Sequence, residues 1–198
     1  MEYFVMTEVK LPDGFELKKV SAEEFRPMFK INRPKLFSET FTFRYNEALS
    51  DRELESQKRL QDNMGKPYEL YFILYFQGNL AGWTFGRQID GEKFYMVNSA
   101  IMPEYRLKGL YKQLLNAVIN ETTNEGFQVV YSRHVATNSA VLVPKLKAGF
   151  IITSFELTDN SGLLVHLSYY TNPIRRKAMD FRSGQCSPDE ELKQFLPV

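Results

Sequence analysis

The chain has 198 residues, of which 43% are hydrophobic and 25% charged, a balance typical of a folded globular protein and not of a disordered chain. Its 25 basic and 24 acidic residues give a formal net charge of +1, so no strong overall field draws it to nucleic acid or to an anionic membrane. The single cysteine, Cys186, excludes a disulfide within the chain and, with no apolar stretch as long as a membrane span, predicts a cytoplasmic protein.

The first predicted elements are a strand and two helices. Residues 15–20 alternate apolar with polar side chains, which predicts a short strand. Two capping-box patterns, a serine followed three residues later by a glutamate, predict helices over 21–30 and 50–64. The segment 32–46 between them is aromatic but has no periodicity, so it is predicted to be irregular.

After residue 67 the chain alternates strands with turns and then with helices. The run YELYFILYF at 68–76 is apolar throughout, which predicts a strand buried on both faces. Turn residues and apolar runs predict further strands over 80–88, 94–102, 127–134, 150–157 and 163–170. Helices are predicted over 109–123, 138–148 and, at the C-terminus, 188–195. The order predicts one α/β (α+β) domain whose mixed, mostly antiparallel sheet carries helices on both faces.

The segment 102–119 holds the pattern most informative about chemistry. A buried strand runs through Arg106, Lys108 and Gly109 directly into an amphipathic helix. Such a unit places free backbone N–H groups and the positive end of a helix dipole at one point, where Gly109 allows a close approach. The spacing is neither that of a P-loop nor that of a dinucleotide fingerprint. The pattern therefore predicts a site for a pyrophosphate.

This loop resembles the pyrophosphate loop of the GNAT superfamily of acyl-CoA-dependent N-acetyltransferases. Arg106 and Gly109 stand at the first and fourth positions of that loop, and Tyr111 stands where glycine or alanine is usual. A second match follows at the family's interval, where Asn138 precedes an apolar helix and the sequence Lys-Ala-Gly-Phe at 147–150. The resemblance covers about 68–157, and it implies a central sheet splayed in the middle.

The resemblance also implies acetyl-CoA as cosubstrate and a place for each part of it. Backbone groups of Ser99 and Ile101 would pair with the thioester and the pantetheine arm, and Asn138 would touch the arm from the other side. The Ser99 N–H would polarise the thioester carbonyl. The pyrophosphate would lie on the loop formed by Arg106, Leu107, Lys108, Gly109, Leu110 and Tyr111.

The proton-transfer groups that such chemistry needs are not at the family's positions. Tyr95 stands where histone-type members carry a glutamate, and Lys145 stands where many members carry a tyrosine acid. Tyr131 and His134 are therefore, with Tyr95 and Ser99, the catalytic candidates. A hydrogen-bonded structural role is the competing interpretation of His134, and His166 is predicted to be structural.

The remaining expectations concern partners and alternatives. The acceptor is expected to be a small-molecule or peptide amine bound against 1–67, with 68–157 as the acetyl-CoA-binding core and 158–198 as the last strand and tail. No metal, nucleic acid or membrane is expected, and the basic run at 175–177 is interpreted as a solvated stretch. A homodimer stays open. The alternatives are a non-catalytic CoA-binding regulatory module and a transferase of a longer acyl group such as succinyl.

Overall fold

The computed structural model describes residues 8–37, 49–62 and 64–196. The strands in these ranges form one seven-stranded sheet in the order β1-β2-β3-β4-β5-β7-β6, in which the β4–β5 pair is parallel and the others are antiparallel. The strands are β1 (Phe15–Lys19), β2 (Glu69–Phe76), β3 (Asn79–Gln88), β4 (Lys93–Ile101), β5 (Val129–Val135), β6 (Ile151–Thr158) and β7 (Gly162–Tyr170). The predicted mixed, mostly antiparallel sheet is confirmed.

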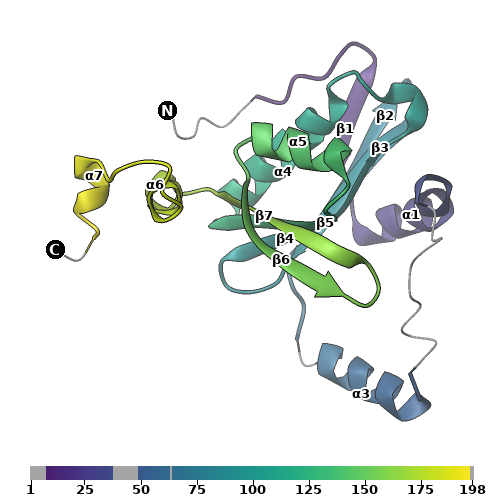
Figure 1. Cartoon of the computed structure of the whole chain (residues 1–198). Coiled ribbons are helices and arrows are strands. Elements are labelled where there is room, and N and C mark those ends of the chain that lie inside the picture. The colour runs from purple at the N-terminus through teal and green to yellow at the C-terminus, as the bar shows by residue number, and fades with distance from the viewer. Residues whose placement is uncertain (1–7, 38–48, 63, 197–198) are drawn as a thin grey trace.

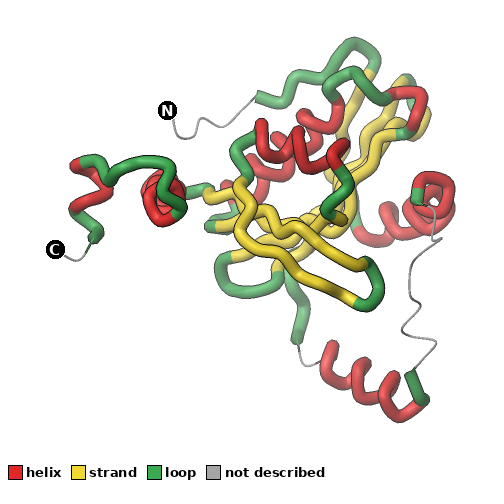
Figure 2. Tube along the Cα trace, viewed as in Figure 1, coloured by secondary structure: helices red, strands yellow, loops and turns green. Residues whose placement is uncertain are grey.

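Helices cover both faces of this sheet, as predicted. The helices are α1 (Ala22–Leu36), α3 (Asp51–Asp62), α4 (Leu110–Asn124), α5 (Ser139–Lys147), α6 (Pro173–Arg182) and α7 (Glu190–Lys193), with a 3₁₀ turn at Pro103–Tyr105. In Figure 1, α4 and α5 lie on one face and α1 lies on the other, while α3 stands apart. Figure 2 shows the same arrangement as helices around a central group of strands, with α6 and α7 beyond the end of β7.

Each covered face of the sheet has its own apolar core. On the α4 face, Phe94, Leu115 and Val130 are among the buried residues of one cluster. On the α1 face, Phe25 of the helix packs with the fully buried Trp83 of β3. Because β2 lies between these two layers, residues Leu70–Leu74 are buried along its whole centre, which confirms the prediction of burial on both faces.

The first helix is longer than predicted. It continues past residue 30 to Leu36 although Pro27 and Pro34 lie inside it. Proline disfavours a helix interior, but Phe25 is buried and Phe29 packs against the same cluster, and this apolar face holds the helix on the sheet. The prediction of an irregular segment from residue 32 is thus wrong up to 36, and 38–46 lies outside the described residues.

The basic run at 175–177 is partly exposed to solvent, and it is also helical and ion-paired. The run lies on α6, whose first turn is capped by the Asn172 side chain, which accepts from the N–H groups of Ile174 and Arg175. Each basic side chain has an acidic partner: Arg175 pairs with Glu92 at 2.8 Å, Arg176 with Asp180 at 2.9 Å, and Lys177 with Asp189 at 2.5 Å. The Arg175 pair joins α6 to the body and the Lys177 pair joins it to the start of α7, while the Arg176 pair lies within α6.

Candidate functional site

Strands β4 and β5 separate after three paired residues. Lys93, Phe94 and Tyr95 pair with Val129, Val130 and Tyr131, and the pairing ends there. On its other side, β4 has a bulge at Val97, because Phe85 and Gly86 of β3 oppose Asn98 and Met96. A bulge bends its strand and increases the local twist. The second half of β4 therefore turns away from β5, as the resemblance implied.

The open edge of β4 presents backbone groups of Ser99 and Ile101. The Met102 N–H donates to the Ala81 carbonyl on β3 at 2.9 Å, so alternation turns Ser99 and Ile101 toward the opposite edge. The Arg106 Nε donates to the Ile101 carbonyl on that edge at 3.1 Å. The side chain of Ser99, in contrast, is bonded to the Thr84 hydroxyl at 2.8 Å. What Ser99 can offer a ligand is its main chain.

The loop from Arg106 into α4 is rich in free backbone donors. Gly109 precedes the helix with a φ of 74°, and no side chain caps the first turn. Within the described ranges, no bonded acceptor is found for the N–H groups of residues 107–111. Arg106 and Lys108 add charge, and the first turn has no acidic residue. Helix N-termini of this kind bind anions, so the loop suits a phosphate group.

Two hollows meet beside these groups. One, of about 480 Å³, extends from the open edge of β4 over the loop to α5. The other, of about 610 Å³, lies between Tyr95, Arg133 and the β6–β7 turn at 158–161. Residues lining both hollows mark the boundary between them: Phe37, Ser99, Tyr111, Asn138 and Val141. The arrangement offers space for two ligands that touch at Ser99.

A chain of hydrogen bonds lies behind Tyr95. The Tyr131 hydroxyl is 2.9 Å from His166 Nδ1, and His166 Nε2 is 2.7 Å from Glu156 Oε2. Arg133 donates to the same carboxylate at 3.0 Å, and with His166 it holds the pKa of Glu156 below its ordinary value. The tautomer whose Nε2–H donates to Glu156 leaves Nδ1 as an acceptor for the Tyr131 hydroxyl. The arrangement can carry a proton away from Tyr131.

His134 lines the larger hollow but is a weak base. Burial, with the nearby Lys145 ammonium, lowers the pKa of His134 to about 3. A general base works best when its pKa lies near the working pH. His134 is neutral at pH 7, where so low a pKa gives it little power to hold a proton. The structure thus places this candidate at the hollow without the basicity the role needs.

Lys145 is the least expected ionisable group near the site. It is completely buried, and its Nζ donates to the Ser132 hydroxyl at 2.9 Å and lies 3.2 Å from Met96 Sδ. The ammonium also stands over the Phe150 ring, 4.6 Å from the centroid. Burial lowers the pKa of Lys145 to about 7. The residue lines neither hollow.

The structure brings most of the predicted site residues together. Ser99, Ile101, Asn138 and residues 106–111 except Lys108 line the smaller hollow, and Tyr95 and His134 line the larger one. Tyr131 is not among the lining residues, but it pairs with Tyr95 on the neighbouring strand, with the two rings 5.5 Å apart. Glu156 was not predicted from the sequence as part of this group, and His166, predicted to be structural, is hydrogen-bonded to both Tyr131 and Glu156. Tyr131, Glu156 and His166 are polar residues within the predicted strands 127–134, 150–157 and 163–170. They indicate a hydrogen-bonded group only once it is known that these strands are neighbours.

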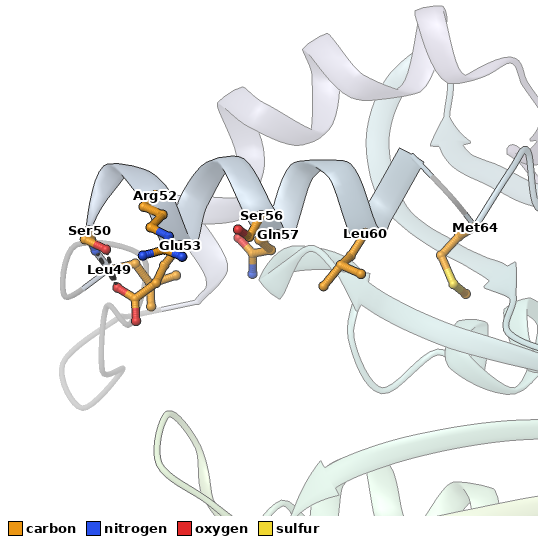
Figure 3. Close-up of a pocket in the computed structure, with 8 residues that line it drawn as sticks. All are labelled: Leu49, Ser50, Arg52, Glu53, Ser56, Gln57, Leu60 and Met64. Atoms are coloured by element: carbon orange, nitrogen blue, oxygen red, sulfur yellow. Dashed lines mark hydrogen bonds between the residues drawn. The ribbon is translucent and has the colours of Figure 1, made fainter.

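A separate hollow runs along α3 and takes no part in this site. It measures about 790 Å³ and, as Figure 3 shows, its described lining residues come from the helix and its flanks. The dashed lines in the figure are the bonds from the Ser50 N–H and hydroxyl to the Glu53 carboxylate, and the bond from the N–H is one of the two that the predicted capping box requires. Among the described residues no other element faces this helix surface, so the hollow carries no functional assignment.

No group of three or more His, Cys, Asp or Glu side chains among the described residues could hold a metal ion. None of the described helices combines the length and the apolar character needed to cross a bilayer.

Comparisons with known proteins agree with this geometry. The model of the acetyltransferase (GNAT) family matches residues 34–150. No curated protein matches the sequence. Among solved structures, the ribosomal-protein-S18-alanine N-acetyltransferase of Escherichia coli is 18% identical, with a TM-score of 0.57 over 80% of this chain and 94% of its own.

Two further solved structures have the same fold. The spermidine N-acetyltransferase of Vibrio cholerae, in complex with CoA and spermine, is 17% identical, with a TM-score of 0.58 over 82% of this chain and 98% of its own. A putative acetyltransferase of Salmonella typhimurium, solved with acetyl-CoA, is 15% identical, with a TM-score of 0.56 over 81% of this chain and 95% of its own.

Proposed function

Since the chain belongs to the acetyltransferase (GNAT) family, we propose that it transfers the acetyl group of acetyl-CoA directly to a primary amine. The observation that carries the proposal is the smaller hollow. It joins the open edge of β4 to a helix N-terminus with free N–H groups, and these are the two features needed for a thioester arm and a pyrophosphate. Arg106 and Lys108 supply positive charge for the phosphates, and Asn138 faces the arm from α5.

The reaction needs both hollows. The free amine of the acceptor attacks the thioester carbonyl carbon, the C–N bond forms, and the C–S bond breaks with its electron pair going to sulfur. The Ser99 N–H, on the open edge of β4, stabilises the negative charge that develops on the carbonyl oxygen. The ammonium must first lose a proton, and the Tyr131 hydroxyl with His166 and Glu156 supports its removal through water at Tyr95.

The acceptor belongs in the larger hollow. The E. coli and V. cholerae neighbours act on an alanine of a ribosomal protein and on spermidine, and both acceptors present an amine. In the present chain Phe37, at the end of α1, lines both hollows, which supports a role for the region before residue 68 in acceptor binding. We therefore propose that the acceptor is an amine of small-molecule or peptide type. We also propose that the chain forms a single domain.

The proposal is tested with the native chain. Acetyl-CoA is titrated by calorimetry, and CoA release is then followed with a panel of primary amines that includes spermidine and a peptide with an N-terminal alanine. We expect binding and amine-dependent release of CoA. Folded protein that binds no acetyl-CoA would contradict the proposal. Tight binding without transfer to any amine would favour a regulatory CoA-binding module. Faster transfer from succinyl-CoA than from acetyl-CoA would favour a transferase of a longer acyl group.

The proton relay makes a separate prediction. Tyr131→Phe removes the hydroxyl that links the site to His166, so we expect kcat to fall about tenfold or more while acetyl-CoA binding is kept. Tyr170→Phe, at the far end of β7 and outside both hollows, is the control and should behave as the native chain. The measurement is steady-state kinetics with the best amine of the panel. An unchanged kcat in Tyr131→Phe would remove the relay from the mechanism.

A further inference from the structure

Lys145 lies at the point where β4 and β5 separate. The pairing of the two strands ends at Tyr95 and its partner Tyr131. Met96 and Ser132 are the residues that follow, and they would form the next pair if the ladder continued. The Lys145 Nζ donates to both of them, to the Met96 Sδ at 3.2 Å and to the Ser132 hydroxyl at 2.9 Å. One ammonium from α5 thus contacts the first unpaired residue of each strand.

The distance between these strands has to change within a few residues. Paired strands lie about 4.8 Å apart, whereas two strands with an extended ligand arm between them must be about 10 Å apart. The bulge at Val97 bends β4 from the β3 side, but it supplies no contact across the separation. Lys145 supplies such a contact, one helical turn after Val141, which lines both hollows.

This position of a lysine is costly for the folded state. The side chain is completely buried, and the Phe150 ring, 4.6 Å from Nζ, adds to its contacts with Met96 and Ser132. None of these three partners carries a negative charge, and a buried charge without an opposite one destabilises a fold. A group that costs stability beside a binding cleft is typical of residues that serve function.

We propose that Lys145 is a positioning residue for acetyl-CoA, whose ammonium keeps β4 and β5 apart so that the open edge of β4 stays accessible to the thioester arm. The inference rests on the proposed function and adds the group that holds its donor site open. Without the ammonium, Met96 and Ser132 can pair, and the ladder closes toward Ser99. The Ser99 N–H then has less room for a thioester carbonyl, so binding of the donor weakens.

Lys145 is assigned no contact with either substrate. It lines neither hollow, and its effect is exerted through the residues of β4 and β5 that it contacts. A test of this role must therefore follow donor binding and strand pairing, and not turnover alone.

The first test is Lys145→Met, with the exposed Lys147 of the same helix changed to methionine as the control. Methionine keeps an unbranched side chain but lacks the terminal ammonium. We expect the affinity for acetyl-CoA, measured by calorimetry, to fall about tenfold, with KM for the amine near the native value. The melting temperature should rise, because the buried charge is removed. General damage to the fold would lower both, so opposite changes in stability and affinity are specific to a positioning role.

A second test needs no ligand. Amide hydrogen exchange at 96–99 should be slower in Lys145→Met by about fivefold or more, because β4 gains backbone bonds to β5. Ser132→Ala removes one of the two bonds of the ammonium and leaves its charge in place. This variant should show a smaller loss of affinity than Lys145→Met, and it should add no further loss when the two are combined.

Three results would overturn the inference. Native affinity for acetyl-CoA in Lys145→Met would show that the ammonium is not needed at the donor site. Exchange at 96–99 that is unchanged or faster would show that it does not keep the strands apart. Loss of stability together with affinity would make the lysine a structural residue only. A native chain that binds no acetyl-CoA would contradict the proposed function, and the exchange measurement would still decide whether Lys145 separates the strands.

Discussion

Gly109→Asp is expected to weaken acetyl-CoA binding by at least about 10²-fold, because it places a carboxylate where the pyrophosphate should lie. Gly109 precedes α4 in a left-handed conformation, and a side chain there would meet open space at the mouth of the site. The variant therefore repels the phosphates and blocks their approach to the free N–H groups. The affinity is measured by calorimetry, as for the native chain.

The control for this variant comes from the same chain. Gly184 has a φ of 75°, against 74° for Gly109, and a side chain there also meets open space. Gly184→Asp thus carries the same strain of a left-handed aspartate, far from the loop, in the segment after α6. We expect it to bind acetyl-CoA as the native chain does. Equal affinity in Gly109→Asp and the native chain would move the phosphate site away from this loop.

Lys145→Met should stabilise the protein near neutral pH by about 1–4 kcal/mol, the range seen when buried ionic groups are replaced by apolar ones. The lysine is completely buried, with a hydroxyl and a thioether as its polar contacts, so its charge is poorly compensated. The Ser132 hydroxyl loses its donor in the variant and reduces the gain, so the double variant with Ser132→Ala should be the more stable of the two.

The pH dependence gives the same prediction a second readout. The pKa of Lys145 is lowered from 10.5 to about 7 in the folded chain. Below pH 7 both folded and unfolded chains hold the proton, and the cost of the buried charge is fully present. Between pH 7 and 10.5 the unfolded chain holds more protons, so the free energy of unfolding rises with pH across that window. Denaturant unfolding at several pH values should show this rise for the native chain and lose it in Lys145→Met.

Lys147→Met serves as the control, because Lys147 is an exposed lysine two residues further along the same helix. It should keep both the native stability and the native pH dependence. A Lys145→Met variant less stable than the native chain at pH 7 would show that the ammonium is well solvated or paired in solution, against the environment described above.

The parts of the site that could be predicted are contiguous in sequence. The loop at 106–111 and its helix are a local pattern, since a strand, a glycine and an apolar helix in succession determine where the free N–H groups lie. The positions of Ser99 and Asn138 came from a family resemblance and its spacing. That β4 splays from β5 was likewise expected from the resemblance alone, and the end of their pairing at Tyr95 was not predicted, because no residue of β4 marks it.

What could not be predicted depends on contacts between distant segments. Tyr131, Glu156 and His166 meet because β7 lies between β5 and β6, an order that the chain order does not reveal. The burial of Lys145 is similar: a lysine in a short helix is expected in solvent, and only the way α5 packs encloses it. Asn172 and Pro173 at the start of α6 are residues typical of a helix N-terminus. This helix was nevertheless not predicted, because the run of charged residues after them was interpreted as a solvated stretch.

The meeting of the two hollows at Ser99 has a consequence for the order of events in turnover. With acetyl-CoA in the smaller hollow and the amine in the larger one, as proposed, neither substrate must leave before the other arrives. Initial rates measured at several fixed concentrations of one substrate should therefore give intersecting reciprocal plots, not the parallel ones of an acylated enzyme.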